Sequence, residues 1–112
     1  MLRIIKSTRE IDSLFAGGKR AAGRLVIILA GRTPEGRGPQ GRVAFIAGRK
    51  LGNAVTRNRA KRVLRAAVAR AGLQWPGWDV AIIARPGVTS APADQVDAAI
   101  RAALTKAGIS DG

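Results

Sequence analysis

Basic side chains crowd positions 49–65 of the chain, and no acidic residue stands anywhere between Glu35 and Asp79. Guanidinium and ammonium groups bind anions, and arginine can hold a phosphate through two parallel hydrogen bonds. The basic residues of this stretch are Arg49, Lys50, Arg57, Arg59, Lys61, Arg62 and Arg65. Their type and density predict a surface that binds phosphate groups.

Most of this stretch should belong to a helix from about Asn53 to Ala71, which Gly72 ends. At about 100° per residue, we interpret one side of the helix as basic and exposed and the opposite side as apolar and buried. The basic side would carry Arg57, Asn58, Lys61, Arg62 and Arg65, with Arg59 apart at its edge, and the apolar side Ala60, Val63, Leu64, Ala67 and Ala71. Like charges four residues apart destabilise a helix by about 0.2–0.5 kcal/mol per pair. A face without compensating acids therefore indicates an anionic partner, and a merely solvated face is the alternative.

The residues that usually perform acid–base or nucleophilic catalysis are scarce. The chain has no His, Cys or Tyr, which removes the common general bases and nucleophiles. The carboxylates are scattered, and Asp94 and Asp97, which could share a helix face, are better explained as complementing the dipole at a helix start than as a metal or acid–base pair. We therefore predict no catalytic residue and no metal ligand in this chain.

Composition indicates a single domain, residues 1–112, with a polyanionic partner. The chain is 46% hydrophobic, and 20 Lys and Arg against 7 Asp and Glu give a net charge of +13. Such self-repulsion is tolerated most easily beside nucleic acid, although a solvated Arg-rich surface is the alternative. The longest apolar run, positions 25–30, is far too short to cross a membrane, and the N-terminus lacks the apolar core of a signal peptide. We expect a cytoplasmic protein with no membrane partner.

The apolar pattern predicts the elements that position the basic stretch. A short helix should run from Ser7 to Phe15, with Ser7 and Glu10 as a capping box. Strands are expected at 24–30 and 42–47, a loop at 31–41, a central strand apolar on both faces at 80–84, and a last helix after Pro92. This order predicts a small α/β sandwich, with helices packed on one sheet.

Positions 50–62 resemble a known family signature. They read Lys-Leu-Gly-Asn-Ala-Val-Thr-Arg-Asn-Arg-Ala-Lys-Arg, which is similar to the K-x-GNAV-x-RNR-x-KR motif of the bacterial ribonuclease P protein component. The match is nearly complete over the motif, and Ile4, Phe15, Gly18, Lys19 and the strand from Asp79 to Arg85 also fit the family. Chance agreement of Gly, Asn and Arg at these fixed spacings is very unlikely.

The resemblance implies a subunit of an endoribonuclease in which a large RNA performs the chemistry. That RNA would bind the Mg²⁺ ions and remove the 5′ leader of precursor tRNA. The implied partners are the catalytic ribonuclease P RNA and precursor tRNA, with no further protein required and no cofactor held by the protein. The resemblance also implies an α+β fold of ribosomal-protein type, with a small mixed sheet of about four strands. A left-handed strand–helix–strand crossover is implied too, whereas general chirality rules predict a right-handed one.

The family's functional positions can be carried over to matching residues. Binding of the RNA subunit would fall to Asn53, Arg57, Asn58, Arg59, Lys61, Arg62 and Arg65. The leader would lie in a cleft between the N-terminal helix and the sheet, lined by Phe15, Phe45, Arg49 and Lys50.

The chain departs from the family at three positions, with Gly48 where a Ser is common and Ile11 and Leu29 where aromatic residues are frequent. Core packing is an equally favoured interpretation of the two Phe residues, and Trp75 and Trp78 are expected to pack in a connector. The competing function is that of a non-catalytic ribosomal-type or RNA-chaperone protein that binds structured RNA by charge. The fixed Gly-Asn-Ala-Val and Arg-Asn-Arg spacing favours the ribonuclease P subunit.

Overall fold

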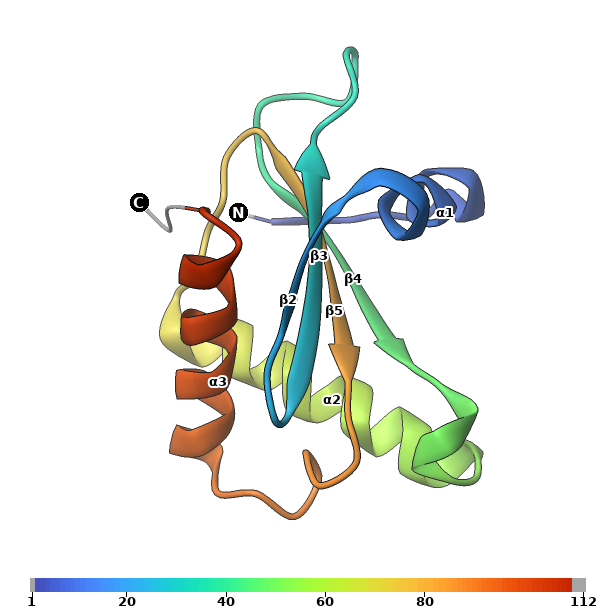
Figure 1. Cartoon of the computed structure of the whole chain (residues 1–112), viewed down its shortest axis with the longest axis vertical. Helices are drawn as coiled ribbons and strands as arrows, with labels where there is room; N and C mark the ends of the chain where they lie inside the picture. Colours follow the sequence, from blue (N-terminus) through green and yellow to red (C-terminus); the bar gives the residue numbers. More distant parts are fainter. Residues whose placement is uncertain (1, 110–112) are drawn as a thin grey trace.

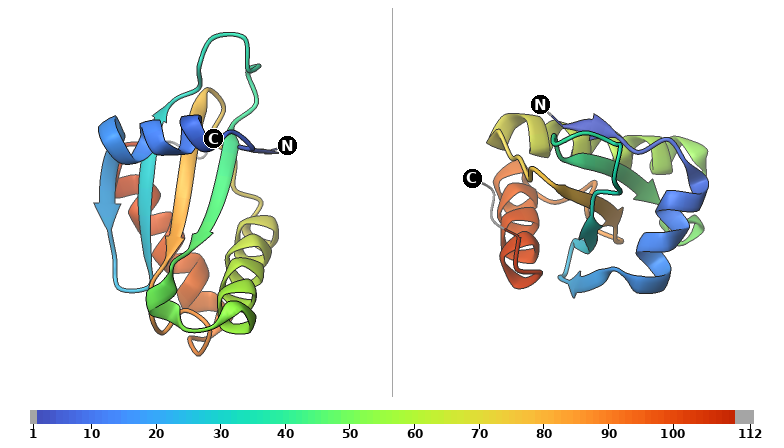
Figure 2. Two further views of the ribbon diagram at one scale, coloured as in Figure 1. Left: turned by 90° about the vertical axis from the view of Figure 1, so that its right-hand side faces the viewer. Right: turned by 90° about the horizontal axis from the view of Figure 1, so that it is seen from above.

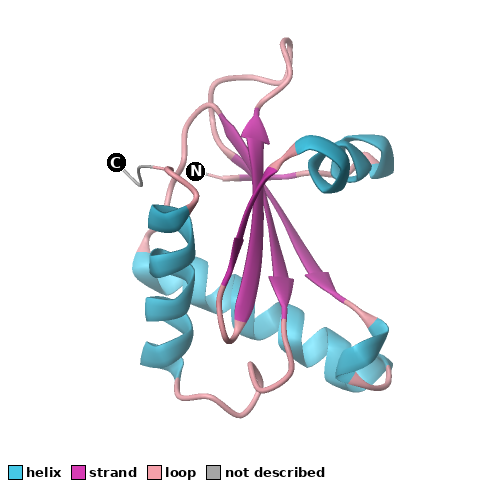
Figure 3. Cartoon of the chain, in the orientation of Figure 1, coloured by secondary structure: helices cyan, strands magenta, loops and turns pink. Residues whose placement is uncertain are grey.

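A computed structural model describes residues 2–109 of the chain, which fold into one five-stranded sheet with helices on both faces (Figure 1). The order of elements confirms the predicted α+β sandwich (Figure 3). In chain order they are β1 (Arg3–Ile4), α1 (Thr8–Gly17), β2 (Lys19–Ala22), β3 (Val26–Arg32), β4 (Arg42–Ala47), the 3-10 turn η1 (Arg49–Leu51), α2 (Ala54–Ala71), β5 (Trp78–Ala84) and α3 (Ala93–Lys106). No helix within residues 2–109 is long and apolar enough to cross a membrane.

Strand β5 is the centre of the sheet, whose strand order is β1-β4-β5-β3-β2. It pairs with β4 in parallel and with β3 antiparallel, so that Ile82 lies between Phe45 and Ile28. Its residues are apolar on both faces because helices cover both sides, as the sequence predicted.

The connection from β4 through α2 to β5 is a left-handed crossover. With α1 toward the viewer, β4 and β5 run side by side in the same direction (Figure 2, left), and α2 packs in the core on the far face of the sheet. Seen along the direction from β4 to β5, the chain passes down β4, back along α2 on the far face and down β5. This path turns counter-clockwise as it moves away from the observer, which is a left-handed turn. This is the exception to the right-handed rule that the family resemblance implied.

The two faces of the sheet bury different amounts of apolar surface. Helices α2 and α3 cover one face with the larger core, in which Leu64, Val80 and Ile100 are fully buried. Helix α1 covers part of the other face, where Leu14 packs on Leu29. It crosses one end of the strands and leaves the remainder of that face open (Figure 2, left).

A buried ionic network fixes α1 to the sheet. The Ser7 side chain caps the helix by accepting a hydrogen bond from the Glu10 amide at 3.3 Å. The Glu10 carboxylate lies 3.1 Å from Arg42, whose guanidinium also binds the buried Asp79 through two hydrogen bonds. Asp79, the largest cause, and Glu10 raise the pKa of Arg42 against the opposing effect of burial. These bonds tie α1, β4 and β5 together from inside.

The sheet has five strands rather than about four, and β3 begins two residues later than predicted. The two strands that the sequence did not predict, β1 and β2, give weak sequence signals, since β1 has two residues and β2 begins with Lys19-Arg20. β2 forms a strand because it pairs with β3, and its charged side chains are tolerated because they reach solvent. Residues 33–41 form the predicted loop.

Candidate nucleic-acid interface

Helix α2 begins and ends where the sequence predicted. Asn53 is the N-cap, and its side-chain oxygen accepts a hydrogen bond from the Thr56 amide at 3.0 Å. Gly72 ends the helix in the left-handed conformation, with φ of 61°. The helix therefore starts directly after η1 and carries the Arg-Asn-Arg motif in its first two turns.

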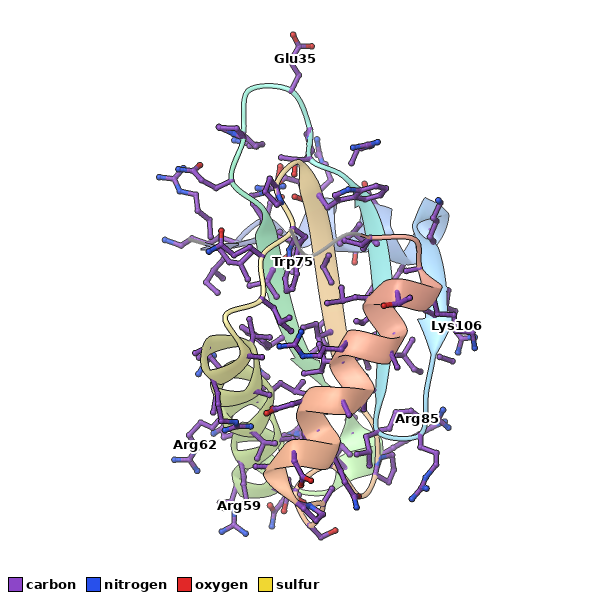
Figure 4. The ribbon with its side chains drawn as sticks, turned by 90° about the vertical axis from the view of Figure 1, so that its left-hand side faces the viewer. Glu35, Arg59, Arg62, Trp75, Arg85 and Lys106 are labelled. Atoms are coloured by element: carbon purple, nitrogen blue, oxygen red, sulfur yellow. The ribbon has the colours of Figure 1, made fainter. Side chains whose placement is uncertain are left out.

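Only part of the predicted basic face is exposed. Arg59 and Arg62 point away from the sheet and from α3 (Figure 4), and Asn58 and Arg65 are exposed beside them. We call these four residues, Asn58, Arg59, Arg62 and Arg65, the α2 ridge. Arg59, which the sequence interpretation set apart, is exposed as well.

The interpretation of Arg57 and Lys61 as outward-facing was wrong, since both side chains are half-buried. Arg57 precedes Leu64 by seven residues, about two helical turns, so it lies on the same side as that core residue. The Nε atom of Arg57 is buried and has no hydrogen-bond partner within the described part of the chain. A buried donor without a partner is unfavourable, and a shift of the side chain that exposes Nε would let Arg57 bind an acceptor from outside the protein.

Two further basic side chains lie at the same end of the molecule as the N-terminus of α2. Arg49 and Lys50 form the turn η1 after β4, and both are exposed. This turn lies at the end of the sheet that α1 leaves open (Figure 2, left). The structure thus brings Arg49 and Lys50 close to the start of the ridge, as the motif predicted.

The two phenylalanines do not share one cleft. Phe15 is 55% exposed on α1, on one side of the sheet. Phe45 is half-buried on the other side, in the core under α2, with the Arg65 guanidinium 5.4 Å from its ring centre. Because side chains alternate along a strand, Phe45 points away from the α1 face while its neighbours Ala44 and Ile46 point toward it.

The open part of the α1 face has an aliphatic floor that the sequence analysis did not assign. Ile46 and Ile83 are partly buried there, beside Ile11 of α1, and Ile27 lies on the same face. The sequence contained this information, because side chains alternate along a strand and these isoleucines therefore lie on the face opposite the larger core. Leu29, by contrast, is buried beneath α1.

The tryptophans behave largely as connector residues. Trp75 is fully buried, and its indole nitrogen donates a hydrogen bond to the Arg42 carbonyl at 2.8 Å. Trp78 opens β5 and is covered by the Arg32 guanidinium, 4.3 Å from its ring centre. Packing therefore accounts for both indole rings.

The carboxylates of residues 2–109 do not assemble a metal site. In the part of the chain that the structure describes, no three Asp, Glu, His or Cys residues cluster closely enough to hold an ion. Asp97 instead pairs with Arg70 at 2.6 Å, which holds the pKa of the aspartate below its usual value. Asp94 remains exposed at the start of α3, where it complements the helix dipole.

Comparison with known proteins gives a consistent picture. The family model Ribonuclease P matches residues 2–108. The ribonuclease P protein component of Symbiobacterium thermophilum is 36% identical over 109 residues, covering 94% of this chain and 90% of the relative. That of Brevibacillus brevis is 33% identical over 110 residues, covering 94% and 82%.

Solved structures support the same fold. The Staphylococcus aureus RNase P protein superimposes with a TM-score of 0.79 at 22% identity, covering 97% of this chain and 98% of that one. The Thermotoga maritima RNase P protein gives a TM-score of 0.77 at 22% identity, covering 95% and 97%. With the sequence matches over nearly the whole length, the chain belongs to the ribonuclease P protein family.

Proposed function

We propose that this chain is the RNA-binding subunit of a ribonuclease P that removes the 5′ leader of precursor tRNA. The observation that carries the proposal is the α2 ridge, a row of exposed guanidinium groups in a stretch without carboxylates from position 36 to 78. The ridge docks on the catalytic RNA, with phosphates bound by Arg59, Arg62 and Arg65. Asn53 and Lys61 support the same surface, and Arg57 adds a phosphate contact once a shift of its side chain exposes the buried Nε.

A second surface binds the leader of precursor tRNA. Arg49 and Lys50 attract its phosphates at the end of the sheet, and the open α1 face continues from them. Phe15 is the one aromatic ring exposed on α1, so base stacking is weaker than a fully aromatic face would provide. Phe45 contributes to the α2 side instead, because its ring lies on the opposite face of the sheet.

The chemistry belongs to the RNA partner in this proposal. Residues 2–109 do not offer a carboxylate cluster that fits Mg²⁺, so the ions required for cleavage are bound by the catalytic RNA. No further protein is needed, and the complex works in the cytoplasm, where precursor tRNA is processed in bacteria.

Reconstitution tests the assignment. The purified protein should not cleave precursor tRNA with any divalent metal, and it should restore cleavage at low Mg²⁺ concentration when a bacterial ribonuclease P RNA is added. Robust cleavage by the protein alone would refute the subunit model. Failure to bind or to assist the RNA would favour a general RNA chaperone.

Two separate assays test the division into two surfaces. Arg59→Ala or Arg57→Ala should weaken assembly with the catalytic RNA, whereas Arg49→Ala or Lys50→Ala should mainly weaken binding of precursor tRNA to the assembled enzyme. Lys106→Ala, which removes one positive charge on α3 far from the ridge, is the matched control (Figure 4). Equal effects of all four substitutions on both assays would contradict separate surfaces.

A further inference from the structure

An apolar groove runs between the edge strand β1 and the C-terminal half of α2, beside the α2 ridge. Its volume of about 330 Å³ lies at the small end of the range of roughly 300–1,000 Å³ typical of small-molecule sites. It is therefore suited to one ring system rather than to a folded segment. Its lining includes Ile4, Val43, Phe45, Arg65, Ala69 and Gln74.

The groove exposes apolar surface that residues 2–109 do not cover. Ile4 is 50% exposed, although it stands next to the large core. Phe45 is half-buried in the same groove, so part of its surface stays accessible. Gln74 adds an exposed amide, which can both donate and accept hydrogen bonds.

A positive charge lies over the aromatic ring of the groove. The Arg65 guanidinium is 5.4 Å from the Phe45 ring centre. Within residues 2–109 it has no carboxylate partner, so its charge is available to an anion. Arg62, which points outward one turn earlier, continues the positive surface along the helix.

Helix polarity gives the groove a direction. The C-terminal end of α2, near Gly72, carries partial negative charge and disfavours a phosphate, whereas Arg65 favours one. An RNA strand that follows the ridge would thus leave its phosphates at Arg65 and extend a neutral group toward Gln74. A flat base, with apolar faces and a polar edge, has that chemistry.

We propose that this groove receives one unpaired nucleobase of the RNA that docks on α2, with the adjoining phosphate bound by Arg65. The base packs on Phe45 and the aliphatic side chains, and its polar edge meets the Gln74 amide. This inference rests on the proposed docking of the catalytic RNA, and it adds a base-specific contact to a surface otherwise built for phosphates. A peptide or a second copy of this net positive chain matches the charged rim less well.

Filling the groove without changing any charge tests the proposal. Ala69 is exposed and lines the groove, so Ala69→Met should occupy it while retaining the helix. Ala102→Met is the matched control, because Ala102 is an exposed alanine on α3 outside the groove. Both variants are compared with the original protein for affinity to a bacterial ribonuclease P RNA and to heparin, a polyanion without bases.

The expected result is a loss of RNA affinity of about tenfold for Ala69→Met, with heparin affinity unchanged and Ala102→Met unaffected in both assays. Unchanged RNA affinity would overturn the proposal, and so would parallel losses for RNA and heparin, which indicate a purely electrostatic surface. A change in the sedimentation of the free protein on filling the groove would show that a second copy occupies it. If the original protein binds heparin but not the RNA, the proposed function fails instead.

Discussion

Removing the buried Arg42 should cost a large part of the stability of this fold. The guanidinium binds Asp79 with hydrogen bonds of 2.9 and 2.5 Å and Glu10 at 3.1 Å, while Asp79 is 3% exposed. In Arg42→Met, Asp79 would keep the Thr33 hydroxyl, 3.0 Å away, but lose its counter-charge. Breaking a buried ion pair from one side costs about 3–5 kcal/mol. The total free energy of unfolding of a domain of this size is about 5–15 kcal/mol.

A double variant separates the charge effect from a packing effect. Arg42→Met with Asp79→Leu removes both buried charges, and a buried pair replaced by apolar groups of similar size is often tolerated. We therefore expect the double variant to be more stable than Arg42→Met alone. Urea unfolding followed by tryptophan fluorescence provides the measurement, because the Trp75 indole bonds to the Arg42 carbonyl.

Two outcomes would refute this reasoning. The first is a loss of less than about 1 kcal/mol for Arg42→Met, which would mean that water or a shifted side chain replaces the guanidinium. The second is a double variant whose loss equals the sum of the two single losses, because additivity would show that the two groups do not interact.

Three other perturbations test the Glu10 ion pair, the close approach at Gly41 and the α2 ridge. Hydrogen bonds from Arg42 first, and then from Arg37, hold the pKa of Glu10 below its ordinary 4.5, so its contribution to stability is present above that pH and is lost as the pH falls through the lowered pKa. Glu10→Gln should therefore destabilise the protein at pH 7 and less so in acid, and a constant difference in urea midpoint from pH 7 to pH 3 would contradict this. Gly41→Ala should destabilise strongly because its Cβ would collide with the backbone between α2 and β5, while Gly48→Ala, with open space around it, should leave the urea midpoint nearly unchanged. Arg59→Ala combined with Arg62→Ala should lower the slope of log affinity against log salt by roughly 1.5 in RNA titrations, since each phosphate contact contributes about 0.7–0.9, and parallel lines would exclude these phosphate contacts.

Local signals predicted much of the fold. Asn53 and Gly72 mark the ends of α2 because a cap and a left-handed glycine act within a few residues. The all-apolar segment ending at Ala84 predicted a central strand, because a strand that is apolar on both sides must be covered on both faces. The strands with short or charged sequences, β1 and β2, depend on partners elsewhere in the chain and left little local trace.

Long-range contacts account for what the sequence did not predict. Arg42 and Asp79 are separated by 37 positions, and nothing near either residue indicates that they meet in the core. Phe45 was expected beside Phe15, but the face on which a strand residue lies depends on how the strand is docked in the sheet. The family resemblance supplied the left-handed crossover, which no pattern in these residues required.

The Arg-Asn-Arg motif gains a structural explanation from the direction of its side chains. Arg57 and Arg59 are two positions apart on a helix, so their side chains leave it in nearly opposite directions. Arg59 points into solvent on the ridge, whereas Arg57 turns toward the sheet, on the side of Leu64, near the end where Arg49 and Lys50 lie. The motif thus places one guanidinium on the ridge and the other, partly buried, on the side of the helix that carries Leu64. A lysine would not serve equally at position 57, because it lacks both the Nε–H and the planar fork with which arginine can bind two phosphate oxygens at once.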